Sequence, residues 1–188
     1  MENFELQSAE LDDPEPGEVL VHTLYQSVDP YMRGRMRDAE SYADPWEVGD
    51  PMRAAVVGEV VESAHSEFEQ GDVVQAEEGL WAEHAVLDGD SLRPARTGAA
   101  PVSTALGVLG MPGVTGYWGI LDVGSPQPGD TVVASAAAGA VGSVVGQVAK
   151  LGGGDVLGIA GAAEKLEWLT AALGVDAALN YQSRTGHQ

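Results

Sequence analysis

The chain has 188 residues, of which 29 are acidic and nine are basic, so its formal charge at pH 7 is −20. This charge argues against nucleic acid and anionic membranes as partners, because both are polyanions. The absence of cysteine excludes disulfides, thiolate nucleophiles, iron–sulfur ligands and thiolate zinc sites. With 44% hydrophobic residues, the chain is long enough and apolar enough to bury a substantial core.

The acidic residues are spread along the whole chain, and this pattern is similar to that of proteins from halophiles, whose cytosol is rich in salt. The four histidines show no H-x-x-x-H spacing, so we predict no metal site. No run reaches membrane-spanning length, and the first residues lack the basic start and apolar core of a signal peptide. A cytoplasmic location is therefore expected.

Short segments separated by clusters of Gly, Pro and Asp dominate the first half of the chain. Four of them are predicted to be strands: Val19–Ser27, Ala54–Ser63, Gly71–Gln75 and Trp81–Val86. Short strands with frequent turn signals favour a compact barrel or sandwich. Residues 101–123 look helical in two pieces, with a break at Met111-Pro112-Gly113. We place the domain boundary near residue 97, between domains of residues 1–97 and 98–188.

The most informative segment is Thr131–Gly146, in which a short apolar strand pattern leads into glycines and then into a helical pattern over Val144–Leu151. This order is the context of a dinucleotide site. Gly139 is predicted to allow the tight turn, Gly142 to let the backbone approach a phosphate, and Gly146 to let the helix pack against its strand. Because the spacing is G-x-x-G-x-x-x-G, the glycines alone leave a plain buried strand–helix turn open.

The alternation continues after this helix. Asp155–Ala160 is predicted to be a second strand, Ala163–Leu173 a helix capped by Gly174, and Ala177–Tyr181 a third strand. The order β-α-β-α-β is typical of a parallel sheet with crossover helices.

The second of these strands ends without the carboxylate that would bind the ribose 2′-hydroxyl of NAD. Lys165, one of only two lysines, follows early in the next helix. A cation there suits a 2′-phosphate, so the residues favour NADP(H). A solvated first-turn side chain is the alternative, although a basic residue is slightly unfavourable at a helix N-terminus.

Four separated motifs resemble the zinc-free branch of the medium-chain dehydrogenase/reductase superfamily, which contains prostaglandin, leukotriene, double-bond and curcumin reductases. They are Val28–Met36, Gly110–Tyr117, Ala137–Gln147, and Glu164-Lys165 with Asn180-Tyr181. The resemblance implies an α/β plus β fold, with a GroES-like barrel domain, a Rossmann domain and an active site between them. It also implies hydride transfer from NADPH to the β-carbon of an α,β-unsaturated ketone or aldehyde, without a metal.

The resemblance implies roles for nine residues. The pyrophosphate turn is matched by Gly139, Ala140, Val141 and Gly142, the 2′-phosphate site by Lys165 and Tyr181, and the nicotinamide segment by Met111 and Thr115. Tyr31 matches a tyrosine of the substrate pocket whose hydroxyl could donate to the carbonyl. For Met111 the alternative is helix-junction packing, and for Tyr31 it is a barrel tyrosine with a backbone partner.

The chain departs from this family at both ends. Relatives usually carry a further strand before Phe4 and continue beyond Tyr181, so we expect a truncated chain that holds only strands 3-2-1 of the Rossmann sheet. Strand 1 then becomes an edge, and because apolar edges pair with other chains, a homo-oligomer is expected, with aggregation or covering of the edge by another segment as the alternatives. Ala162 and Gln182 stand where relatives often carry a hydroxyl and a lysine, which weakens the expected selection of NADP over NAD.

The leading hypothesis is an NADPH-dependent, zinc-free enone reductase, present as part of its chain and acting on a small molecule. A zinc-free quinone oxidoreductase would differ in its acceptor. A catalytically silent NADP-binding fragment is the alternative outside the enzymes.

The acidic surface generates the first testable prediction. The melting temperature should rise by roughly 5 °C between dilute buffer and molar KCl, because salt screens the repulsion between carboxylates and about 1 kcal/mol of relief moves a small domain by that much. Circular dichroism in both buffers measures this. A melting temperature that does not move would contradict the halophile-like interpretation.

Overall fold

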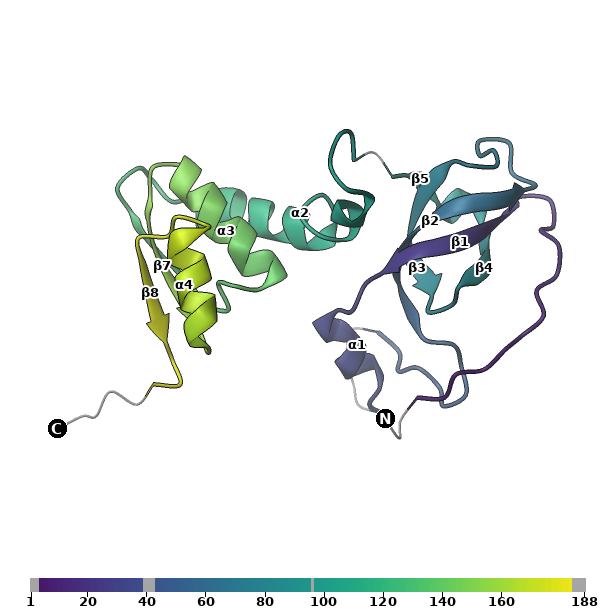
Figure 1. Cartoon of the computed structure of the whole chain (residues 1–188), viewed down its shortest axis with the longest axis horizontal. Coiled ribbons are helices and arrows are strands. Elements are labelled where there is room, and N and C mark those ends of the chain that lie inside the picture. The colour runs from purple at the N-terminus through teal and green to yellow at the C-terminus, as the bar shows by residue number, and fades with distance from the viewer. Residues whose placement is uncertain (1–3, 39–42, 96, 184–188) are drawn as a thin grey trace. The chain divides into compact units, whose positions relative to one another are not determined.

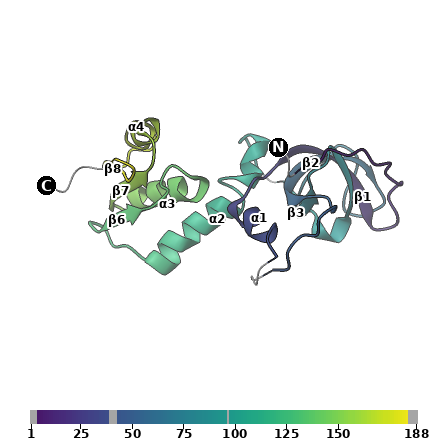
Figure 2. The ribbon, with the colours of Figure 1, turned by 90° about the horizontal axis from the view of Figure 1, so that it is seen from below.

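The computed structural model describes residues 4–38, 43–95 and 97–183. The chain divides into two compact units, Met1–Leu106 and Gly107–Gln188, so residue 97 lies inside the first unit. Figure 1 labels most helices and strands of both units, and Figure 2 also labels β6. Within the described ranges, no helix is long and apolar enough to cross a membrane.

The first unit is built on a five-stranded antiparallel sheet with the strand order β4-β1-β2-β3-β5. Its strands are β1 (Glu18–Gln26), β2 (Arg53–Ser63), β3 (Val73–Leu80), β4 (His84–Asp88) and β5 (Arg93–Pro94). The predictions for β1 and β2 match closely, those for β3 and β4 overlap the strands but begin and end two to five residues too early, and the two-residue β5 was missed. A short helix, α1 (Pro30–Arg35), follows β1, and two 3-10 turns, Gly89–Ser91 and Val102–Leu106, lie later in the unit.

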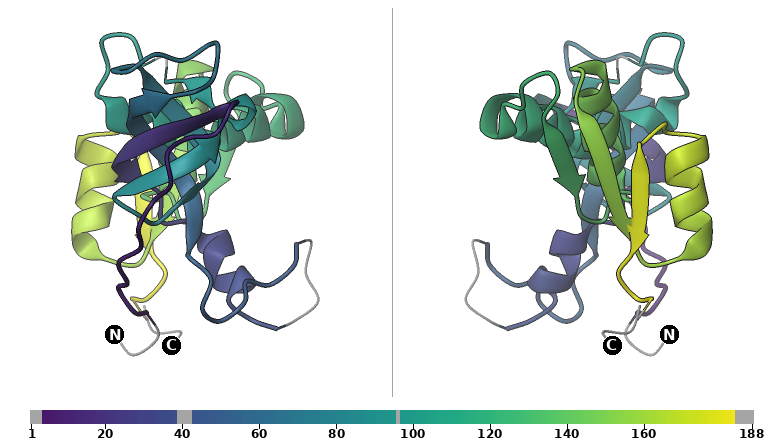
Figure 3. Two further views of the ribbon diagram at one scale, coloured as in Figure 1. Left: turned by 90° about the vertical axis from the view of Figure 1, so that its right-hand side faces the viewer. Right: turned by 90° about the vertical axis from the view of Figure 1, so that its left-hand side faces the viewer.

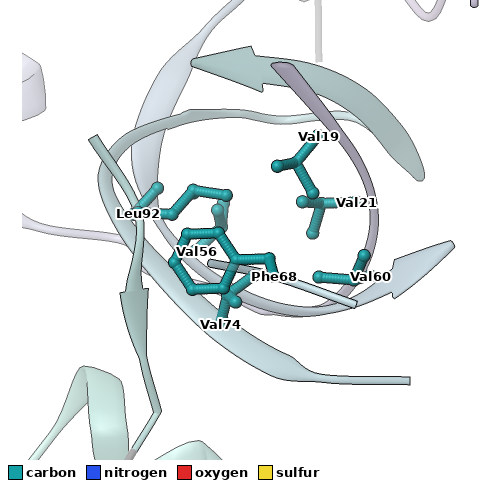
Figure 4. Packing of buried hydrophobic residues seen from close by; sticks show 8 residues of the cluster. Val19, Val21, Val56, Val60, Phe68, Val74 and Leu92 are labelled. Atoms are coloured by element: carbon teal, nitrogen blue, oxygen red, sulfur yellow. The ribbon is translucent and has the colours of Figure 1, made fainter. Parts of the chain in front are cut away.

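The core of this unit lies on the inner face of the curved sheet. Val19 and Val21, two residues apart on β1, are 0% and 1% exposed, as period-two alternation requires. Figure 4 shows the sheet curving around their side chains and those of Val56, Val60, Phe68, Val74 and Leu92. Register shifts in the β1–β2 and β2–β3 pairs bend the strands. The GroES-like first domain is thus confirmed.

The second unit holds a three-stranded parallel sheet in the order β6-β7-β8. The strands are β6 (Thr131–Ala134), β7 (Asp155–Ala160) and β8 (Ala177–Asn180). The helices are α2 (Met111–Trp118), α3 (Ala140–Leu151) and α4 (Ala163–Ala171), and a π-helical turn, Gly119–Gly124, continues α2. Figure 3 shows α4 beside β8. This is the partial Rossmann sheet with strands 3-2-1 that the sequence predicts.

Three expectations about this unit were wrong. The two helical pieces are present, as the 3-10 turn Val102–Leu106 and as α2 with its π-helical continuation, but the break between them lies at residues 107–110. Met111-Pro112-Gly113 is instead the first turn of α2, because proline is tolerated where a helical N–H has no partner anyway. Helix α3 begins at Ala140, earlier than the predicted Val144. Gly174 does not cap α4: the cap is Ala172, and Gly174, with φ of +68°, forms the turn that follows.

One carboxylate ties three segments of the second unit together. Asp176 Oδ1 and Oδ2 lie 2.8 Å and 3.0 Å from Nζ of Lys150, in the last turn of α3. Asp176 Oδ2 also accepts a 2.6 Å hydrogen bond from the backbone N–H of Val156 in β7. The hydrogen bond from Lys150, followed by that from Val156, holds the pKa of Asp176 below its ordinary value.

A lowered pKa means that the carboxylate stabilises the fold above its ordinary, unfolded-state pKa, and that this contribution is lost as the pH falls through the folded-state pKa. Asp176→Asn should therefore lower the melting temperature at pH 7, and the gap to the wild type should shrink in acid. Thermal unfolding across pH 2–7 measures both effects. The matched control is Asp155→Asn at an exposed position on β7, which should change little. An equal loss in both variants would contradict the role of Asp176.

Candidate functional site

The predicted cofactor residues of the second unit gather at one edge of its sheet. Because β6, β7 and β8 are parallel, their carboxyl ends meet at the same edge. The turn containing Gly139 follows β6, the loop leading to Lys165 follows β7, and Tyr181 follows β8. In open α/β sheets, ligands bind outside this carboxyl edge.

The turn after β6 is built differently from the prediction. Gly139 has φ of −87° and ψ of 173°, which is extended backbone that any residue adopts. The residue in the left-handed region is Ala136, with φ of +48°. The turn is attached to the sheet by the backbone N–H of Ala137, which donates to the carbonyl oxygen of Ile159 at 3.0 Å. The tight turn therefore depends on Ala136 rather than on the conformational freedom of Gly139.

Gly142 is required by the packing of α3 on this turn. A Cβ at Gly142 would collide with the carbonyl oxygen of Ala136 and lie 2.8 Å from Cα of Ala137. Both neighbours are backbone, which cannot move aside cheaply. The close approach shown here is thus to the chain's own turn, and an approach of Gly142 to a phosphate stays a prediction.

Gly146 lies on the buried side of α3, against Val156 of β7 and Val175. A Cβ there would be 3.5 Å from Val175 Cγ1 and 3.8 Å from Val156 Cγ1, which are ordinary contacts. The predicted packing of Gly146 is present, although it is against β7 rather than β6. The site has room for a methyl group.

Two helices begin at this edge without a side-chain cap. The N-cap of α3 is Gly139 and that of α4 is Ala162, and neither position supplies a capping hydrogen bond. The first N–H groups of a helix have no intrahelical partner, and the helix dipole adds partial positive charge there. Ala140 and Val141, in the first turn of α3, are exposed. The edge therefore presents two sets of N–H donors to anionic groups, which fits a dinucleotide with more than one phosphate.

The loop after β7 is covered by the residue after β8. A Cβ at Gly161 would lie 3.0 Å from the hydroxyl oxygen of Tyr181 and 3.0 Å from Nε2 of Gln182. Gln182 Nε2 donates to the Tyr181 hydroxyl at 3.3 Å, and the tyrosine is 66% exposed. Sequence reasoning treated Gln182 only as a missing lysine and overlooked Gly161. The glycine directly after a buried strand was the available signal.

The two lysines have different surroundings. Lys150 is paired with Asp176, whereas Lys165 is exposed in the first turn of α4, and no ion pair is recorded for it in the described part of the chain. Lys165 is therefore an available cation beside an uncapped helix N-terminus.

Met111 and Thr115 lie four residues apart on α2 and share one exposed side of that helix. Their helix packs closely against α3, as Figures 1 and 2 show. A Cβ at Gly116 would lie 2.9 Å from Cβ of Val144 and 3.0 Å from the carbonyl oxygen of Val141. Gly116 thus lies against the start of α3, and the role of its neighbour Thr115 stays a prediction. Tyr31, half-buried in α1, belongs to the first unit, and its role stays a prediction.

Comparison with known proteins finds relatives that are all oxidoreductases. Residues 1–95 match a family described as the N-terminal domain of oxidoreductase. The NADPH-dependent curcumin reductase of Escherichia coli is 44% identical over 182 residues, which are 97% of this chain and 52% of the relative. Prostaglandin reductase 1 of Rattus norvegicus is 47% identical over 184 residues, which are 96% and 53%.

Among solved structures, CurA from Vibrio vulnificus in complex with NADPH is 45% identical, with a TM-score of 0.90 over 97% of this chain and 54% of that chain. The chain thus spans about half the length of these relatives. The GroES-like domain, the partial Rossmann sheet and the match of residues 1–95 place the chain in the medium-chain dehydrogenase/reductase superfamily. Within it, the chain belongs to the branch of the curcumin and prostaglandin reductases.

The two glycines of α3 give a matched pair of variants. Gly142→Ala should destabilise the second unit by about 1–3 kcal/mol, because its Cβ meets backbone. Gly146→Ala should be neutral or stabilise the unit by up to about 1 kcal/mol, because alanine favours the helix and the space is open. Urea unfolding of both variants measures the difference. Equal effects of the two substitutions would contradict the inference that the turn after β6 excludes a side chain at position 142.

Proposed function

We propose that this chain forms the GroES-like domain and the adenosine-binding half of an NADPH-dependent reductase of α,β-unsaturated ketones and aldehydes. The observation that carries the proposal is the carboxyl edge of the parallel sheet, where two uncapped helix N-termini and Lys165 lie together. Such an edge suits a ligand with three anionic groups, two in a pyrophosphate and one on the ribose.

The pyrophosphate would lie at the start of α3, on the N–H groups of residues 140–142. The 2′-phosphate would lie at the start of α4, where Lys165 supplies a cation and Tyr181 a hydroxyl. Residues 160–163, which end β7 and start α4, include no carboxylate, and the first acidic residue is Glu164, in the first turn of α4 beside Lys165. The curcumin reductase is NADPH-dependent and CurA forms a complex with NADPH, which supports the same cofactor for this chain.

The bound cofactor would supply a hydride to the β-carbon of the substrate. Negative charge would then develop on the substrate's carbonyl oxygen, where a hydrogen-bond donor lowers the barrier. Tyr31 would donate its hydroxyl to that oxygen, and Met111 and Thr115 would orient the nicotinamide. The conjugated acceptor is already electrophilic, so the proposal is zinc-independent.

Self-association and a cytoplasmic location are also part of the proposal. Strand β6 is an edge of the described sheet, and Val133 on it is 58% exposed. An exposed apolar edge pairs readily with another strand.

We predict that the 188-residue chain forms oligomers in light scattering, and that Val133→Lys shifts them toward monomer because a charge on an edge strand opposes pairing. A monodisperse wild-type monomer would contradict the prediction.

The cofactor assignment is tested at Lys165. Lys165→Ala should weaken NADPH binding at least tenfold, equal to about 1.4 kcal/mol, and should leave NADH binding unchanged. Lys165→Arg, which keeps the charge, is the control and should bind NADPH well. Titration calorimetry with both nucleotides measures this. Unchanged NADPH affinity in Lys165→Ala would show that this lysine does not bind the 2′-phosphate.

The reaction is tested by following NADPH oxidation with a panel of enones, enals and quinones. Turnover of enones supports the proposal. Turnover of quinones alone would favour a quinone oxidoreductase. NADPH binding without any turnover would favour a silent NADP-binding fragment.

A further inference from the structure

The outer face of the first unit carries a pair of stacked histidines that the proposed function does not use. His22 of β1 and His84 of β4 are direct cross-strand partners. Their ring centroids are 4.8 Å apart and their planes differ by 22°. Both side chains are exposed.

The register explains why the rings are so close. The backbone N–H of Thr23 donates to the carbonyl oxygen of Glu83 at 2.9 Å, so the next pair along the antiparallel ladder, His22 and His84, is the non-hydrogen-bonded one. Side chains approach each other most closely in such pairs. The neighbouring residues Val21 and Ala85 are buried, so both imidazoles project from the outer face.

The ring nitrogens of this pair are available for ligation. No hydrogen bond or ion pair of the His22 or His84 side chain is recorded in the described ranges. His65 differs, because its Nε2 lies 3.3 Å from Asp90 Oδ1 and its Nδ1 accepts from the backbone N–H of Glu67 at 3.2 Å. Only the cross-strand pair thus offers two uncommitted imidazoles side by side among the described histidines.

We propose that His22 and His84 form a two-imidazole binding site for a divalent transition-metal ion, with Cu²⁺ bound most tightly. Neutral imidazole is a preferred ligand of copper, nickel and zinc, and affinity for such sites peaks at Cu²⁺. In the stacked arrangement the lone pairs of the ring nitrogens lie in two nearly parallel ring planes. One ion with metal–nitrogen bonds of about 2.0–2.1 Å therefore binds both rings only after the side chains rotate out of the stack, and exposed side chains make such rotamer changes rapidly.

The surroundings favour a cation at this place. Glu59 on β2 is the direct partner of His22 on its other side, and it is exposed on the same outer face. The formal charge of −20 attracts cations to the whole surface. No group of three or more protein ligands that could hold a metal occurs among the described residues, so the remaining coordination positions belong to water. The site is therefore open, and it is independent of the proposed reductase activity.

The test is titration of the whole chain with Cu²⁺ alone, followed by calorimetry and electron paramagnetic resonance. The wild type should bind one ion with a spectrum split by two imidazole nitrogens. His22→Gln and His84→Gln should each weaken that binding at least tenfold and remove the two-nitrogen splitting. The control His65→Gln should match the wild type. The absence of cysteine removes the strongest competing ligand.

Thermal unfolding provides a readout that separates this site from weak binding to carboxylates. Cu²⁺ should raise the melting temperature of the wild type, because the folded sheet holds the two histidines of β1 and β4 side by side and so binds the ion more tightly than the unfolded chain does. The rise should disappear in His22→Gln and in His84→Gln, whose folding is checked by circular dichroism without metal. If either glutamine variant binds Cu²⁺ like the wild type, or if the wild type shows no two-nitrogen splitting, the proposal is wrong.

Discussion

The second unit depends on one close approach, between the turn after β6 and the first turn of α3. Ala136 bends the chain through the left-handed region, and Gly142 lets the helix begin directly against that bend. The helix N-terminus is thereby held at the carboxyl edge of the sheet. Helix α2 uses the same strategy, because Gly116 admits the backbone of α3. The start of α3 and its contact with α2 are therefore set by close approaches that leave no room for a side chain at Gly142 and Gly116.

The two lysines of this strongly acidic protein have different electrostatic surroundings. Lys150 neutralises Asp176 and so joins α3 to β7 and to the segment before β8. Lys165 carries no recorded ion pair in the described part of the chain and stands where an uncapped helix begins. A polyanionic ligand is repelled by the surface as a whole, so it needs a local concentration of positive potential. The helix N-termini and Lys165 provide that concentration at one edge of the sheet.

Periodicity predicted most of the elements, and its errors have identifiable causes. The strands β6, β7 and β8 and helix α4 were predicted closely because each carries its own apolar pattern. The first turns of α2 and α3 were missed because Pro112 and Gly142 are poor helix formers in isolation. Both are tolerated where they stand, the proline because its missing N–H would have no partner, and the glycine because packing requires it. Tertiary contact overrode local propensity at Gly142, whereas the helix start itself accommodates Pro112.

The sequence by itself determined the fold class, the alternation that makes the sheet parallel, and the place of the glycine turn, since these follow from patterns along the chain. Only the tertiary structure decided that Ala136, not Gly139, adopts the strained conformation, and that Tyr181 lies over Gly161. It alone brought His22 beside His84. The physical reason is the same throughout: strand register and loop closure place residues that are distant in sequence next to each other, and no local pattern records those distances.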